Sequence, residues 1–144
     1  MRRSIGAVTL VVRDYDEAIA FYTKKLGFEL RADTELGGGK RWVLVAPRGG
    51  QTSASSGALL LAQAANAAQR RAIGKQAGGR VFLFLHTDNF RRDHAAFVRR
   101  GVTFLEKPRH EAYGSVAVFQ DLYGNRWDLI EHKKPKLTAK TKRR

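Results

Sequence analysis

One pattern of predicted elements occurs twice along the chain, and it constrains the fold more than any other feature. Each copy starts with a short apolar run typical of a strand, continues with an amphipathic helix and ends with three further strands. When Ala7–Tyr22 is aligned with Phe82–Phe97, Asp14 falls opposite Asn89 at the start of each helix. We therefore expect one α+β domain of two βαβββ modules.

The predicted elements of the first copy are a strand at Ala7–Val12, a helix from Asp14 to Leu26 that Gly27 ends, and strands at Phe28–Ala32, Arg41–Val45 and Ala58–Ala62. Those of the second copy are a strand at Val81–Thr87, a helix at Phe90–Arg100 that Gly101 ends, and strands at Val102–Leu105, Ser115–Phe119 and Arg126–Glu131.

A length of 144 residues suits a single domain. We place that domain at residues 1–132, with module one at about 5–62, a connector at 63–79 and module two at about 80–132. The connector is polar and Ala-rich, with a short helix expected over Asn66–Ile73. Residues 133–144 contain seven Lys or Arg and no acid, and with so little apolar content we expect a basic disordered tail.

The net charge of +14 leaves two interpretations of the surface open. Either the basic residues are a solvated surface and tail, or the tail contacts nucleic acid. The second ranks lower because the sequence has no recognisable readout helix or ordered aromatic and basic interleaving. The chain has no cysteine, which excludes disulfides and thiolate sites. With no apolar run of membrane-spanning length, we expect a cytoplasmic protein without a membrane partner.

Two segments resemble a known family. The run VTLVVRDYDEAIAFYTKKLGFEL is similar to the opening of a vicinal oxygen chelate module, and VAVFQDLYGNRWDLIE is similar to its closing hairpin. The chain thus resembles the glyoxalase, bleomycin resistance and dioxygenase (vicinal oxygen chelate) superfamily. This resemblance implies a cup-shaped sheet, a homodimer and, in the enzymes, a divalent metal held by His or Gln and Glu from the first and last strands of each module.

The metal positions that the resemblance implies are almost all apolar in this sequence. They fall on Ala7, on Phe82, within Leu59–Leu61 and on Asp128, and only Asp128 has a donor atom. A catalytic divalent ion needs about three protein ligands, so we expect no metal and no other cofactor. The resemblance then points to members that bind a small ligand in the cup, as drug-sequestering proteins do. Whether this chain is also a lyase or dioxygenase-like enzyme stays open.

Strand alternation assigns side chains to the predicted cup. We expect three kinds of ligand-binding residue: those that face the cup, aromatic residues that could stack on a planar ligand, and residues of a polar loop at the lip of the cup. Together they are Thr9, Val11, Trp42, Phe82, Phe84, His86, Arg109, Tyr113, Phe119 and Asp128. His86 is the candidate catalytic base, with Asp128 or Arg109 orienting a substrate. The alternative for His86 is a partly solvated side chain at the end of its strand, without a function.

Overall fold

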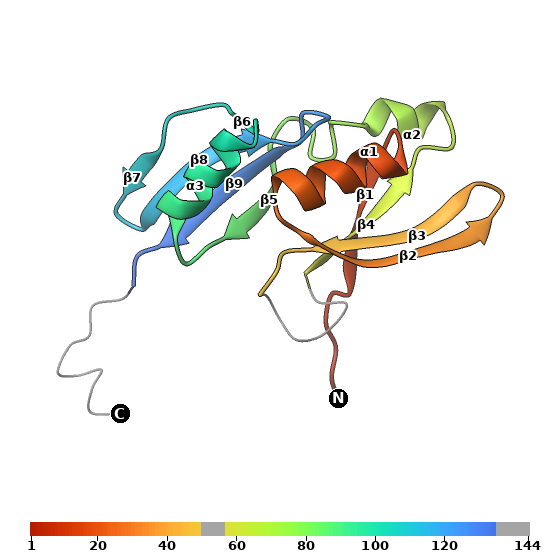
Figure 1. Ribbon diagram of the computed structural model, residues 1–144, viewed down its shortest axis with the longest axis horizontal. Coiled ribbons are helices and arrows are strands. Elements are labelled where there is room, and N and C mark those ends of the chain that lie inside the picture. Colours follow the sequence, from red (N-terminus) through yellow and green to blue (C-terminus); the bar gives the residue numbers. More distant parts are fainter. Residues whose placement is uncertain (50–56, 135–144) are drawn as a thin grey trace.

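The structure is a computed structural model that describes residues 1–49 and 57–134. Its elements in chain order are β1 (Ala7–Val12), α1 (Tyr15–Ala20), η1 (Phe21–Lys25), β2 (Glu29–Gly37), β3 (Lys40–Ala46), β4 (Ala58–Gln63), α2 (Ala67–Ala72), β5 (Val81–His86), α3 (Phe90–Arg99), β6 (Thr103–Phe104), β7 (Arg109–Glu111), β8 (Gly114–Gln120) and β9 (Arg126–His132). Two successive strand–helix–strands units confirm the expected α+β fold (Figure 1). Most of the expected basic tail lies outside the described residues.

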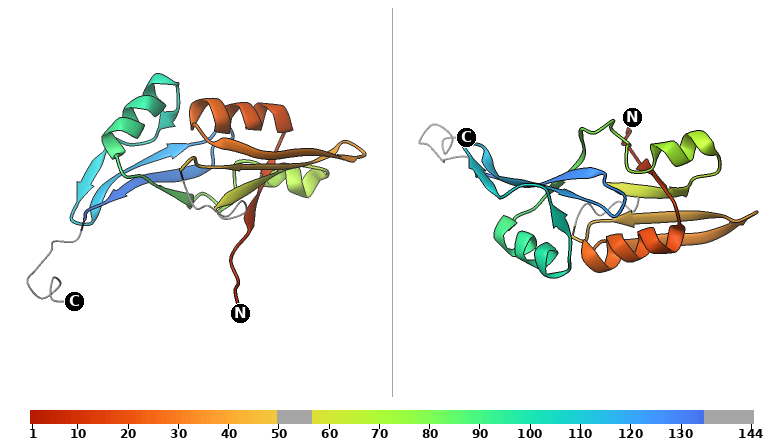
Figure 2. Two further views of the ribbon diagram at one scale, coloured as in Figure 1. Left: turned by 60° about the horizontal axis from the view of Figure 1, so that its bottom comes forward. Right: turned by 90° about the horizontal axis from the view of Figure 1, so that it is seen from above.

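Each module has its own sheet of mixed strand direction. The strand order is β1-β4-β3-β2 in the first sheet and β5-β9-β8-β6 in the second, where β7 also pairs with β8. The pairs β1–β4 and β5–β9 are parallel and the other pairs are antiparallel. In both modules the parallel partner is reached only after the chain has passed through a helix and further strands. Figure 2 shows that α1 and α3 consequently lie on the same side of the two sheets.

The two helices begin in the same way, as the sequence repeat predicts. The amide of Glu17 donates a 2.9 Å hydrogen bond to Asp14 Oδ2, and the amide of Arg92 donates a 3.0 Å bond to Asn89 Oδ1. Each side chain thus satisfies a backbone N–H that has no partner within the helix. The first helix widens into the π-helical turn η1, which carries the buried Tyr22.

The hydrophobic core spans both modules. Tyr22 and Phe28 of module one pack against Trp127 of module two, with ring centroids 6.1 and 5.8 Å apart. Trp127 in turn stacks on Phe119 at 5.9 Å. Because these four side chains are almost fully buried, their packing holds the two sheets in a fixed relation.

Two predicted segments differ from the structure. β2 extends to Gly37, well beyond the predicted end at Ala32, and most of its side chains are exposed. Its outer part therefore has no apolar alternation that a sequence pattern would reveal. The predicted polar loop at Arg109–Tyr113 begins instead with the short strand β7, paired with β8, because the edge of β8 offers free backbone groups to the chain that follows β6.

Candidate functional site

A cavity lies where the edge strands of the two sheets face each other. Within the described residues β1 pairs only with β4, and β5 only with β9. At one end of β1, Gln76 joins the modules: the amide of Val11 donates to Gln76 Oε1 at 3.3 Å, and the amide of Gln76 donates to Asn125 Oδ1 at 3.2 Å. At the other end the gap widens into a cavity of about 550 Å³. We call this cavity the crevice.

The lining of the crevice is mainly apolar. It consists of Ile5, Gly6, Ala7, Val8, Phe28, Arg31, Pro47, Arg48, Gly49, Gly57, Ala58, Leu59, Leu83, Phe84, Leu85, His86 and Trp127. Phe28, Leu59 and Trp127 belong to the buried core, whereas Phe84 is 60% exposed. Apolar walls with a few polar groups are typical of sites for small molecules.

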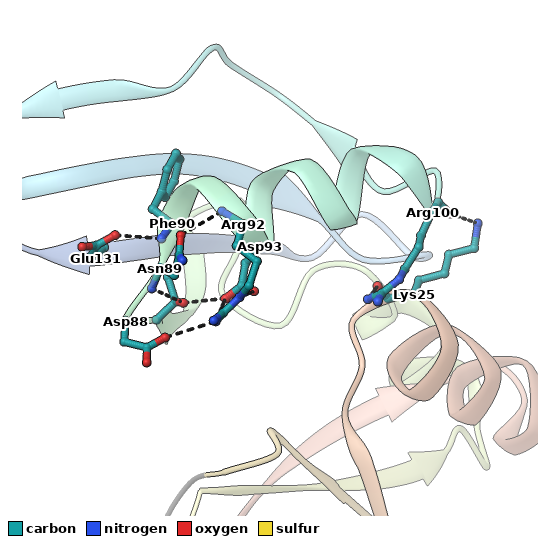
Figure 3. Close-up of polar contacts among 9 residues, drawn as sticks. Lys25, Asp88, Asn89, Phe90, Arg92, Asp93, Arg100 and Glu131 are labelled. Atoms are coloured by element: carbon teal, nitrogen blue, oxygen red, sulfur yellow. Dashed lines mark hydrogen bonds and ion pairs between the residues drawn. The ribbon is translucent and has the colours of Figure 1, made fainter.

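A second hollow of about 810 Å³ adjoins the crevice beside α3. It shares Phe28, Pro47, Arg48, Gly49, Leu85 and His86 with the crevice, and its remaining lining consists of Leu26, Gly27, Thr87, Asp88, Arg92, Asp93, Ala96, Phe97, Arg99 and Arg100. Because four arginines line it, we call it the basic cleft. Figure 3 draws the side chains of Asp88, Arg92, Asp93 and Arg100, which belong to this lining.

Phe84 and His86 are the two predicted ligand-binding residues that line the crevice. Phe84 is in register with Asp128, and His86 with Ile130, so these four side chains share one face of the second sheet. His86 is exposed at the end of β5 and lines the basic cleft as well. Its ring lies 4.9 Å from that of His132, edge to face.

Asp128, Arg109 and Tyr113 lie outside the crevice. Asp128 Oδ1 is buried and forms no hydrogen bond with any described residue. Burial raises the pKa of Asp128, the positive charge of Arg109 partly offsets this effect, and the negative charge of Glu106 adds to it. The Arg109 guanidinium donates to Glu106 at 3.1 Å and to Glu111 at 2.9 Å, so its charge is compensated within module two.

Thr9, Val11 and Trp42 also lie outside the crevice. Thr9 is in register with Leu60, on the face of the first sheet that is turned away from the core. Val11 is in register with Ala62 on the same face. Trp42 is 44% exposed and lines a different hollow of about 480 Å³ together with Leu60.

The structure corrects the placement of Phe119 and Phe82. Phe119 is fully buried in the core and in register with Trp127. Its neighbour Val118 is in register with Asp128, so Phe119 lies on the opposite face of the sheet from Asp128 and from the predicted cup. Phe82 is the extra residue in a register shift between Val81 and Leu83, and it packs against the core. A bulge of this kind breaks strict alternation, which is why the sequence pattern placed Phe82 in the cup.

The residues at the family's metal positions do not fit a divalent ion. Ala7 is in register with Ala58 and Thr9 with Leu60, whereas Leu59 and Leu61 are buried on the core face. The register thus places Ala58 and Leu60 beside β1, and neither has a donor side chain. Among the residues that the structure describes, no group of three or more His, Asp or Glu side chains is arranged to hold a metal.

Sequence reasoning missed Phe28 and Arg48 as lining residues, whereas it left Trp127 open between stacking on a ligand and packing in the core. Trp127 and Phe28 are core residues by pattern, and only the unpaired edges of β1 and β5 open the core to them. Arg48 follows β3 in a loop with no periodic signal.

None of the described helices is long and apolar enough to span a membrane.

Three proteins illustrate what this chain is similar to. An uncharacterised protein from Shewanella frigidimarina is 52% identical over 91% of this chain and 95% of its own length. The crystal structure of UcmS2 has a TM-score of 0.75 and 33% identity, covering 90% of this chain and 98% of that one. The crystal structure of TnmS3, described as an antibiotic binding protein from Streptomyces, has a TM-score of 0.70 and 28% identity over 92% of this chain and 98% of that one.

The family comparison agrees with the fold and with the two motifs at the ends of the modules. The model of the Glyoxalase/Bleomycin resistance protein/Dioxygenase superfamily matches residues 4–129, a range that starts before β1, ends within β9 and includes every residue of the crevice lining. On this match and the arrangement of the two βαβββ modules, this chain belongs to the Glyoxalase/Bleomycin resistance protein/Dioxygenase superfamily.

Proposed function

We propose that this chain is a metal-independent binding protein for a small, partly apolar or aromatic molecule, and that the crevice is its binding site. The observation that carries this proposal is the combination of the exposed Phe84 and the core ring of Trp127 in one cavity of about 550 Å³. Aromatic faces attract planar apolar molecules, and a cavity of this volume suits a ligand of moderate size.

Two further observations support binding without a metal. Ala7 and Leu60 lie at positions where a metal enzyme of this fold would need donor atoms, and neither side chain has one. In addition, the structurally similar TnmS3 is described as an antibiotic binding protein. A cavity with these properties holds a ligand by burial of apolar area, which contributes about 25 cal/mol per Å² removed from water.

The proposal includes a cytoplasmic homodimer. Among the described residues the outer edge of β2 is unpaired, and Leu36 and Trp42 are exposed away from the crevice. A second copy would cover these surfaces. Light scattering at micromolar concentration measures the mass directly, and a monomer would contradict this part alone.

A second candidate function is an enzyme of the same fold that uses His86. The observation in its favour is that His86 lines both the crevice and the basic cleft and lies beside His132. An imidazole there reaches a bound molecule from either hollow and can accept a proton from it. If this candidate is right, a bound compound is converted, and His86→Gln abolishes the conversion while it preserves binding.

A thermal-shift screen with aromatic and polycyclic compounds tests the main proposal. A ligand at a hundredfold excess over its Kd raises the stability by about 2.7 kcal/mol. Ala7→Phe fills the crevice and is expected to abolish the shift. Thr9→Phe is the matched control, since Thr9 lies two residues along the same strand face and outside the crevice. Equal loss in both variants would move the site to the wider sheet face, and no loss in Ala7→Phe would contradict the crevice.

A further inference from the structure

The basic cleft gathers arginines from both modules. Arg48 follows β3 of module one, Arg92 lies in the first turn of α3, and Arg99 and Arg100 lie at its end. Figure 3 shows the Arg92 side chain near the start of α3 and the Arg100 side chain beside Lys25 at the other end of the helix. Segments far apart in the sequence therefore direct positive charge into one hollow.

The charge of Arg92 is compensated by its own neighbours. Its guanidinium forms ion pairs of 3.1 Å with Asp88 and 3.0 Å with Asp93 (Figure 3). These are the two acidic side chains in the lining of the basic cleft. No carboxylate of that lining is left for the other three arginines.

Arg48, Arg99 and Arg100 form no ion pair with a carboxylate among the described residues. Arg100 is held by hydrogen bonds with Lys25: its Nη1 donates to Lys25 O at 3.3 Å, and Lys25 Nζ donates to Arg100 O at 3.0 Å (Figure 3). These bonds fix the guanidinium against Gly27, which lines the basic cleft.

The helix dipole accounts for only part of this arrangement. Cations are favoured at the C-terminal end of a helix, which explains Arg99 and Arg100. It does not explain Arg48, which belongs to the other module. Three uncompensated guanidinium groups around one hollow repel each other, and an anion placed between them removes that repulsion.

We propose that the basic cleft binds the acidic group of an amphipathic ligand whose apolar body occupies the adjoining crevice. This inference rests on the proposed function and narrows it: the ligand is an aromatic or apolar molecule with a carboxylate, sulfonate or phosphate group. Arg48 and His86 line both hollows, so the acidic group and the apolar body of one molecule would lie in hollows that meet at these two side chains. Guanidinium groups suit such anions because their planar donors match pairs of anionic oxygens.

A pair of fluorescent probes that differ only in the acidic group tests this inference. The probes are 8-anilinonaphthalene-1-sulfonate and its uncharged parent, N-phenyl-1-naphthylamine. The full chain is expected to bind the sulfonate at least tenfold more tightly, and added salt is expected to reduce this preference because salt screens exposed charges. Arg99→Ala, which changes the basic cleft alone, is expected to weaken the sulfonate about fivefold and to leave the neutral probe unchanged. Arg48→Ala is expected to weaken the sulfonate more than the neutral probe, because Arg48 lines both hollows.

Arg91→Ala is the matched control. Arg91 is exposed on the same helix, does not line the basic cleft, and its removal changes the net charge equally. A loss of sulfonate affinity in Arg91→Ala as large as in Arg99→Ala would overturn the inference, because the effect would then come from overall charge. Equal affinity of the wild type for both probes would also overturn the inference. In that case the proposed function would still stand if Ala7→Phe abolished the binding of both probes. If Ala7→Phe weakened neither probe, the proposed function would fail as well.

Discussion

Tyr22→Phe tests the polar contact that joins the two modules inside the core. The Tyr22 hydroxyl donates a 2.7 Å hydrogen bond to Asp121 Oδ2 and accepts one of 3.3 Å from Trp127 Nε1. Tyr22 is fully buried and Asp121 is 3% exposed. Water therefore cannot replace the lost hydroxyl without disturbing the packing, and the substitution leaves a carboxylate oxygen and an indole N–H short of a partner.

The expected loss of unfolding free energy is about 2–4 kcal/mol. A hydrogen bond to a charged group contributes about 1.5–3 kcal/mol, and the longer bond from Trp127 adds up to about 1. The loss is not larger because Asp121 keeps three donors, the amides of Tyr123 and Asn125 and the side-chain amide of Asn125, each at 2.9 Å. For a chain of this length the melting temperature falls by roughly 6–12 °C.

Urea unfolding followed by circular dichroism measures this change, with Tyr123→Phe as the control. Tyr123 also donates a 2.7 Å hydrogen bond to a carboxylate, that of Glu17, whose side chain is 30% exposed. Water can hydrate Glu17 in the variant, so we expect a loss below about 1 kcal/mol. A loss for Tyr22→Phe no larger than that for Tyr123→Phe would refute the reasoning from burial.

Three further outcomes are expected. Burial and then the charge of Asp121 raise the pKa of Tyr22 well above its usual value, so the stability that Tyr22 contributes is present below about pH 10 and declines above it. Urea unfolding at pH 8 and pH 11 should therefore show a smaller loss of unfolding free energy in Tyr22→Phe than in wild type. Asp128 also has a raised pKa, so Asp128→Asn should equal or exceed wild type in melting temperature at pH 7 and lose that advantage near pH 4. Deletion of Lys133–Arg144 should leave the melting temperature unchanged and weaken retention on DNA; undiminished retention would point to the folded domain.

The fold was predictable because its signals are local and occur twice. Asp14 and Asn89 cap equivalent helices, and Leu10 and Val12 face the core as alternation requires. β7 escaped prediction because three polar residues have no apolar period, and their pairing depends on the free edge of β8.

The candidate site was predictable only in part. Phe84 and His86 follow from alternation along β5, but the bulge at Phe82 has no sequence signal. Trp127 faces the core by pattern and reaches the crevice only because β1 and β5 do not pair. Arg48 and Arg99 meet at one hollow through the packing of two modules, which depends on contacts that no local sequence pattern contains.

Energy transfer from Trp127 to a bound probe tests most directly whether the crevice binds an apolar molecule without a metal. The chain has two tryptophans, so Trp42→Phe leaves Trp127, in the crevice lining, as the only donor. Titration of this variant with N-phenyl-1-naphthylamine in excess EDTA is expected to give saturable transfer that the additional change Ala7→Phe abolishes. Transfer that EDTA removes, or that persists undiminished when Ala7→Phe fills the crevice, would contradict the account.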